Sequence, residues 1–134
     1  LDATGPPQPI FQTNDAITFR LHYHASTRVD RPAIGIGLFD TGVGTHIAGP
    51  NNTMCEFVID ALEGHGYIDY QVDRLPLLPG TFAVTTAVFD WDVIHCIDYV
   101  SAATQFSITT GGTTERHGIL ALNGRWDHHA TGTQ

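Results

Sequence analysis

The first residues of this chain that could do chemistry are two histidines in an alternating stretch. His22 and His24 lie two positions apart, so on a β-strand their side chains share one face. Such a pair can hold a metal ion when a third histidine and a glutamate join it. No glutamate follows in this stretch or in the next one. We therefore interpret both histidines as exposed side chains and predict no metal site.

Three aspartates gather around a tryptophan further along the chain. Asp90 and Asp92 flank Trp91, and Asp98 follows. Paired carboxylates can hydrolyse a glycosidic bond when they lie roughly 5 Å or about 6.5–9.5 Å apart. The acid of such a pair needs a buried pocket that raises its pKa, and a loop between strands offers little burial. Aspartates that cap a turn are the simpler interpretation.

A serine nucleophile with a histidine base is not indicated either. His46 and His95 could pair with Ser101 or Ser107. However, neither serine stands in the glycine-framed turn that exposes a catalytic serine. Because no set of nucleophile, base and orienting group is present, we predict no catalytic residue and no cofactor.

Two rows of polar side chains are better suited to binding a sugar. Sugars present vicinal hydroxyls and apolar C–H patches, which proteins contact with planar polar groups and aromatic faces. The outward positions of two alternating stretches combine these types. We predict that they form one shallow glycan platform, made of Arg20, His22 and His24 with Tyr67, Asp69 and Gln71. An ordinary solvated sheet face is the alternative interpretation.

Two further surfaces could hold a glycan. The second choice is the loop end that carries Trp91, Asp92 and His95, provided that the indole is exposed for stacking and not buried in the core. The third surface is a flat row of small residues that could seat either a glycan or another protomer: Gly35, Gly37, Ala83, Thr85 and Ala87.

Short β-strands must position all of these residues. Alternation with a period of two runs through 17–24, 34–38, 67–73, 80–90 and 104–109, and shorter strands are expected at 45–48 and 118–122. The segment 53–62 fits a strand or one helical turn. We expect an all-β fold, an Ig-like or jelly-roll antiparallel β-sandwich of about eight strands. Its predicted core includes Ile17, Phe19, Leu21, Phe82, Val84 and Val88.

A stiff corner precedes the strand at 80–90. Pro76 and Pro79 fix their own φ and push the residues before them toward extended geometry. The leucines between and beside the two prolines can plug the end of the core. We predict a positive φ at Gly80, because a tight turn after Pro79 would need it.

The composition limits the partners of the chain. Its 134 residues suit one domain, and it has a net charge of -8 and no lysine. Such a surface repels nucleic acid and anionic lipid, and without lysine a Walker A nucleotide site cannot form. No apolar run approaches the ~20 residues of a membrane span. We predict no binding of nucleic acid and no insertion into a membrane.

The two cysteines and the two chain ends complete the organisation. We expect Cys55 and Cys96 to be partly buried thiols in a reducing compartment, in preference to a disulfide. The prolines near the start indicate a linker at 1–9 that leads into an edge strand. The sandwich is expected at 10–128 and a polar tail at 129–134. Because the chain starts without methionine, we expect a piece of a longer protein.

The stretch LPLLPGTFAVTTAVFD resembles a segment of the C-terminal domain of Wzt-type ABC-transporter ATPases. Three other segments fit the same family: TNDAITFRLHYHA, PAIGIGLFDTGVGTHIAGPNN and GILALNGRWDH. Together they cover most of residues 10–128. Asn14 stands where the family usually has glycine. The order and spacing of the segments carry the resemblance.

The resemblance implies a carbohydrate-binding module without catalytic activity. Such a module recognises an O-antigen-type polysaccharide before export, lies in the cytoplasm, and follows a nucleotide-binding domain upstream. The resemblance also implies a homodimer. The flexible Gly111-Gly112 break lets the segment 118–122 pair either with its own sheet or with that of a partner, and we predict that this segment contributes to the dimer interface. Two other functions stay open: a structural Ig-like module for protein contacts, and a cupin-like metal enzyme at His22 and His24.

Overall fold

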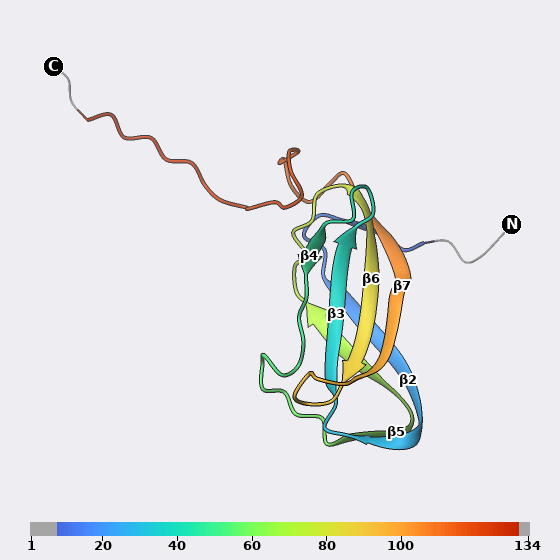
Figure 1. The fold of residues 1–134 in the computed structure, drawn as a ribbon. Helices are drawn as coiled ribbons and strands as arrows, with labels where there is room; N and C mark the ends of the chain where they lie inside the picture. Colours follow the sequence, from blue (N-terminus) through green and yellow to red (C-terminus); the bar gives the residue numbers. More distant parts are fainter. Residues whose placement is uncertain (1–7, 132–134) are drawn as a thin grey trace, which may run out of the picture.

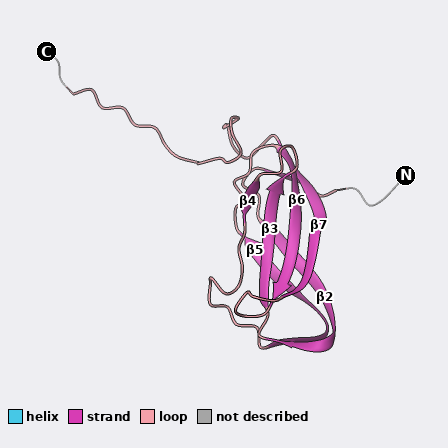
Figure 2. Cartoon of the chain, viewed as in Figure 1, coloured by secondary structure: helices cyan, strands magenta, loops and turns pink. Residues whose placement is uncertain are grey.

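The chain folds into β-strands that form two layers (Figure 1). The computed structural model describes residues 8–131, and these contain seven strands and no helix (Figure 2). The strands are β1 (Ile10–Gln12), β2 (Ile17–Asp30), β3 (Ala33–Asp40), β4 (His46–Ala48), β5 (Ala61–Val72), β6 (Gly80–Phe89) and β7 (Cys96–Thr109). One layer has the order β1-β7-β6-β3-β4, and the other is the pair β2-β5. The predicted all-β sandwich is confirmed, with seven strands where about eight were expected.

The five-stranded layer is mostly antiparallel. β6 pairs antiparallel with both β3 and β7, whereas β1 runs parallel to β7. This parallel pair departs from the purely antiparallel sandwich that the sequence predicted. β1 is nevertheless an edge strand, as the prolines before it indicate, and the amide of Ser107 donates to the carbonyl of Pro9 over 3.0 Å.

The core lies between the two layers. Ile17, Phe82 and Val84 are buried in it, as predicted. Phe19 and Leu21 are only partly buried and pack against this cluster. The predicted core position 88 is also half-buried. The two-stranded layer is narrower than the layer it covers, so it leaves part of the inner surface accessible.

The leucines of the proline-rich corner close one end of the core, as predicted. Leu75, Leu77 and Leu78 are all buried, and Leu77 is only 1% exposed. Burying one leucine fully contributes about 1.5–3 kcal/mol. The prediction of a positive φ at Gly80 is wrong, because positive φ occurs at other glycines. Gly80 is the first residue of β6 and pairs with Ile108, which requires an extended backbone.

Several strands are longer than the alternation predicted. β5 begins at Ala61 and not at 67, and β7 begins at Cys96 and not at 104. Gly66 precedes the expected strand, yet it already pairs with Tyr23 of β2, whose ring lies over it. The segment 53–62 begins as turns and contains no helix.

The C-terminal segment does not form the predicted strand. Residues 118–122 make one isolated bridge, Leu77 with Leu120, and Ala121 is buried against the corner. Beyond this bridge the chain runs away from the sandwich (Figure 1). Trp126, which lies beyond the bridge, is 100% exposed. The bridge is short because the amides of Leu122 and Asn123 donate to Glu115 instead of to a strand.

The two cysteines form no disulfide, as predicted, but the prediction that they are partly buried is wrong. Cys55 and Cys96 are both free thiols, but both are exposed, since each lies in or beside a loop. Among residues 8–131, no helix has the length and apolarity needed to cross a bilayer. Residues 1–7 of the expected linker and 132–134 of the expected tail lie outside the described residues.

Candidate functional site

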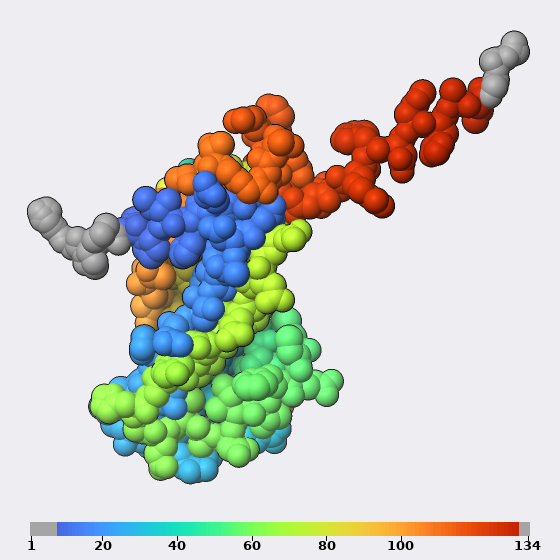
Figure 3. Space-filling view, turned by 180° about the vertical axis from the view of Figure 1, so that it is seen from behind, coloured from blue at the N-terminus to red at the C-terminus, as the bar shows by residue number. Residues whose placement is uncertain are grey.

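The predicted platform residues lie on one face of the β2-β5 pair. The register places Arg20 opposite Asp69, and His22 opposite Tyr67. The same face continues to Gln71 at one end and to His24 at the other. Figure 3 shows the two strands, in blue and yellow-green, side by side across this face of the molecule. The predicted neighbourhood of the two strands is confirmed, and glycan binding by these residues stays a prediction.

An ion pair organises the centre of this platform. The guanidinium of Arg20 donates from Nε and Nη2 to the two carboxylate oxygens of Asp69, over 2.8 and 2.9 Å. These hydrogen bonds lower the pKa of the Asp69 carboxyl and raise that of Arg20, although partial desolvation opposes both shifts. The carboxylate is therefore ionised at neutral pH, and its geometry is set by two parallel hydrogen bonds.

The same arginine also braces the aromatic residue of the platform. The guanidinium carbon of Arg20 lies 4.1 Å from the centroid of the Tyr67 ring, a cation–π contact. The His22 ring lies 6.0 Å from Tyr67 on the same face. Tyr67 still exposes 56% of its surface. The platform thus presents an aromatic side chain that is held in place without being covered.

The second-choice loop end is organised by an aspartate that the site prediction did not include. The Asp90 carboxylate accepts hydrogen bonds from the amides of Ile94 and His95, and it lies 3.0 Å from Nδ1 of the His95 ring. These contacts, the Ile94 amide first, lower the pKa of Asp90. Trp91 is half-buried, with the Arg31 guanidinium 4.8 Å from its ring, while Asp92 is exposed. The loop is ordered, but it offers less aromatic surface than Tyr67 does.

The third predicted surface, the flat row of small residues, is partly covered. Gly37 pairs with Thr85 in neighbouring strands, so the predicted row does exist. However, the Phe39 ring lies over Gly37 and stacks on His46 at 4.7 Å between centroids. Only the end of the row near Gly35 stays open, because nothing stands above that residue. The room for a flat ligand is correspondingly reduced.

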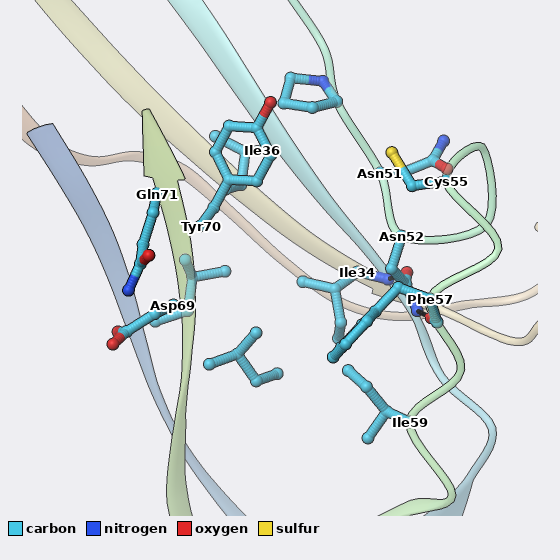
Figure 4. A pocket seen from close by; sticks show the side chains of 13 residues that line it. Ile34, Ile36, Asn51, Asn52, Cys55, Phe57, Ile59, Asp69, Tyr70 and Gln71 are labelled. Carbon is cyan, nitrogen blue, oxygen red and sulfur yellow. Dashed lines mark hydrogen bonds between the residues drawn. The ribbon is translucent and has the colours of Figure 1, made fainter. Parts of the chain in front are cut away.

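Sequence reasoning missed an apolar cavity between β5 and the segment 50–59. Its volume is about 290 Å³, and leucine and isoleucine side chains from both layers form its floor. Figure 4 shows Tyr70 on one side of the cavity and Asn51, Cys55 and Phe57 on the other, while Asp69 and Gln71 point away from it. No sequence signal could have revealed it, because the segment 50–59 has no alternation.

One asparagine holds that segment against the sheet. Oδ1 of Asn52 accepts a hydrogen bond of 2.6 Å from the amide of Ile34 in β3. Its Nδ2 donates to the carbonyls of Pro32 and Phe57, over 3.1 and 3.0 Å. This one side chain bonds to three backbone groups, and it adds to the backbone hydrogen bonds of Pro50 and Asn52 with β3 that hold the same wall of the cavity.

A third histidine joins the predicted pair from the opposite strand. His65 lies opposite His24 in the register, and their rings stack. His65 was not predicted as a site residue, because the strand was expected to begin only at Tyr67. Extending the alternation backwards from Tyr67 would have placed it on the platform face. Within residues 8–131, no group of three or more histidine, cysteine, aspartate and glutamate side chains is placed to hold a metal ion.

The two strand layers and the exposed polar face define the class of this domain as a β-sandwich module. The chain belongs to the Wzt C-terminal domain family, whose sequence profile matches residues 1–122. A crystal structure of the C-terminal domain of Wzt has the same fold, with a TM-score of 0.75 at 14% sequence identity. That match covers 92% of this chain and 75% of the other. No curated protein matches the chain.

Proposed function

We propose that this domain is a non-catalytic carbohydrate-binding module for an O-antigen-type polysaccharide. In the cytoplasm it would follow the nucleotide-binding domain of an ABC exporter and select the chain to be exported. Membership of the Wzt C-terminal domain family supports this role. The net charge of -8 agrees with a neutral or weakly charged glycan better than with nucleic acid.

The observation that carries the proposal is the braced and exposed ring of Tyr67. A sugar can stack its C–H patch on this ring, while its hydroxyls bond to the polar groups beside it. Arg20 and Asp69 bond to each other in the free domain, so both side chains are ordered before the glycan binds. Binding therefore costs little of their conformational entropy. Gln71 and His22 extend the row along the face for further sugar units.

The expected affinity is weak. A shallow face orders few side chains and buries little of the ligand, so the dissociation constant should be on the order of 10 µM to 1 mM. Weak binding suits a module that must release a long polymer to the transporter. Many contacts along the same chain would raise the apparent affinity of a polymer above that of a short fragment.

The test is a titration of the cell's own polysaccharide against single variants. Tyr67→Ala should remove the stacking face and weaken binding by about 1–3 kcal/mol, if a sugar stacks as strongly as a nucleic-acid base does on an aromatic side chain. Asp69→Asn should weaken it less, since the amide still accepts one hydrogen bond. Isothermal calorimetry or glycan-array binding would measure both.

A matched control is available on the other layer. Tyr99 in β7 is 58% exposed, close to the 56% of Tyr67, and it pairs with Ala87 of the small-residue face. Tyr99→Ala should bind like the parent domain. Unchanged binding in Tyr67→Ala together with a loss in Trp91→Ala would place the site on the loop end. A loss in Tyr70→Ala alone would place it in the cavity by the segment 50–59.

We also propose that the domain acts as a homodimer in which the C-terminal segment is exchanged. Leu122 and Trp126 are 83% and 100% exposed on a segment that leaves the sandwich. The free edge of β2 borders a cavity of about 380 Å³ between the layers, lined by Phe19 and Leu21. The C-terminal segment of a second copy, which carries Leu122 and Trp126, is the occupant that this chain itself can supply.

A further inference from the structure

Two exposed histidines on β2 and β5 face each other across the strand pair. His24 and His65 are direct partners in the antiparallel register. Their ring centroids are 4.1 Å apart, and the ring planes differ by only 8°. Both side chains lie on the solvent side of the sheet, beyond the ion pair and tyrosine of the platform. The two imidazoles are therefore accessible together from one direction.

We propose that His24 and His65 form a two-histidine site for a divalent transition-metal ion, with water in the remaining positions. Neutral imidazole nitrogen is a preferred ligand of Zn²⁺, Ni²⁺ and Cu²⁺. A metal–nitrogen distance of about 2.0–2.1 Å places two ligating nitrogens of one ion roughly 3 Å apart. An ion bound by both imidazoles lies in the plane of each ring, so the two exposed side chains must rotate out of the stack until their nitrogens converge on the ion.

The sheet holds the two ligands in register. The next pairs along the same face are His22 with Tyr67 and Arg20 with Asp69, and the latter is locked by two hydrogen bonds. A slip by one residue would turn every one of these side chains to the inner face, so the register is strongly specified. The histidines thus meet in the folded chain and are far apart in the unfolded one.

The His24–His65 site differs from the pair His22 and His24, which the sequence places two positions apart on one strand. His22 and His24 also share a face, but residues two apart on one strand are separated by roughly 6.5–7 Å. The cross-strand pair is closer, because directly opposite residues of an antiparallel pair have Cβ atoms only about 4.5–5.5 Å apart. Two protein ligands leave most coordination positions to water, so binding should be reversible and accessible to chelators. The net charge of -8 favours a cation at this surface.

Ni²⁺ is the probe for the test, because the exposed thiols could reduce Cu²⁺. An ion that binds only the native chain stabilises it by mass action, so the urea midpoint should rise as Ni²⁺ is added. His24→Ala and His65→Ala should each abolish the rise. Each variant should also bind Ni²⁺ more weakly than the parent. Loss of a residue that only supports a ligand lowers metal affinity roughly 10–100-fold, and loss of the ligand itself should lower it at least as much. Both positions are exposed, so both variants should fold normally without metal.

Two controls separate this site from other histidines. His22→Ala should retain the Ni²⁺-dependent rise. The double change His128→Ala with His129→Ala should retain it too, since an extended tail binds metal equally in the folded and unfolded chains. In NMR spectra of the parent, paramagnetic broadening should begin at the rings of His24 and His65.

An unchanged urea midpoint in the parent, or an equal rise of the midpoint in His65→Ala, would overturn the proposal. So would a loss in His22→Ala as large as that in His24→Ala. None of these outcomes depends on glycan binding.

Discussion

At the scale of single residues, two glycines with positive φ differ in what surrounds them. Gly112 has a φ of 76°, and a Cβ at this position would collide with the backbone carbonyl of Thr13. Gly118 has a φ of 89°, but a Cβ there would meet nothing within 4 Å. The first glycine is needed for space as well as for conformation, and the second only for conformation.

Gly112→Ala should therefore destabilise the domain more than Gly118→Ala does. We expect about 1 kcal/mol for Gly118→Ala, from backbone strain alone, and roughly 2–4 kcal/mol for Gly112→Ala. Urea denaturation of both variants would measure the difference. Equal losses would mean that the backbone at Thr13 moves aside at no cost.

The ion pair on the platform predicts a dependence of stability on pH. Hydrogen bonds from Arg20 lower the pKa of Asp69 in the folded chain relative to the unfolded chain. A carboxyl of this kind contributes stability above its unfolded pKa and loses that contribution as the pH falls through its folded pKa. Stability should therefore decline below about pH 4, the ordinary range for aspartate.

Asp69→Asn should make that decline shallower. The slope should not vanish, because the pKa of Asp90 is also lowered and responds in the same range. Urea midpoints between neutral pH and about pH 2 would show the difference. If the urea midpoint of Asp69→Asn falls with pH as steeply as that of the parent, the pKa of Asp69 does not differ between the folded and unfolded chains.

At the scale of elements, the side chain of Asn52 joins the segment 50–59 to β3 in addition to the backbone hydrogen bonds between them. Asn52→Ala would leave the amide of Ile34 and the carbonyls of Pro32 and Phe57 without this partner. Loss of a partner to half-buried backbone groups costs about 1–3 kcal/mol. We expect a destabilisation in that range and faster hydrogen exchange at the Ile34 amide.

The neighbouring asparagine provides the control for this prediction. Asn51 bonds to the hydroxyl of Thr53 and the amide of Met54, both within its own turn. Asn51→Ala should therefore leave exchange at Ile34 unchanged. If the two variants behave alike, the segment is held by its backbone hydrogen bonds and apolar contacts and not by the Asn52 side chain.

At the scale of the whole molecule, exchange of the C-terminal segment predicts a dependence of the dimer on residues after 121. Deletion of 122–134 removes the exposed Leu122 and Trp126 but keeps Ala121, which is buried in the corner. This deletion should give a folded monomer. Deletion of 129–134 alone should leave the dimer intact. Light scattering after size-exclusion chromatography would decide between the two states, and a dimer in both deletions would refute exchange.

The sequence by itself determined the all-β class, the two faces of β2, and the burial of the proline corner. Period-two alternation between Ile17 and His24 assigns each side chain to a face without knowledge of any partner strand. The prolines around Leu77 restrict the backbone through their own rings. These properties are local, because they depend on the geometry of neighbouring residues in one stretch of chain.

Only the tertiary structure decided the pairings between distant segments. Gly80 has no positive φ because its ladder partner Ile108 requires an extended backbone. Gly66 stays within a strand because Tyr23 packs over it, and His65 consequently meets His24. Asn52 lies in a stretch without periodicity, and its three partners come from the fold. Register and the strand edges left open follow from long-range contacts, which local alternation does not specify.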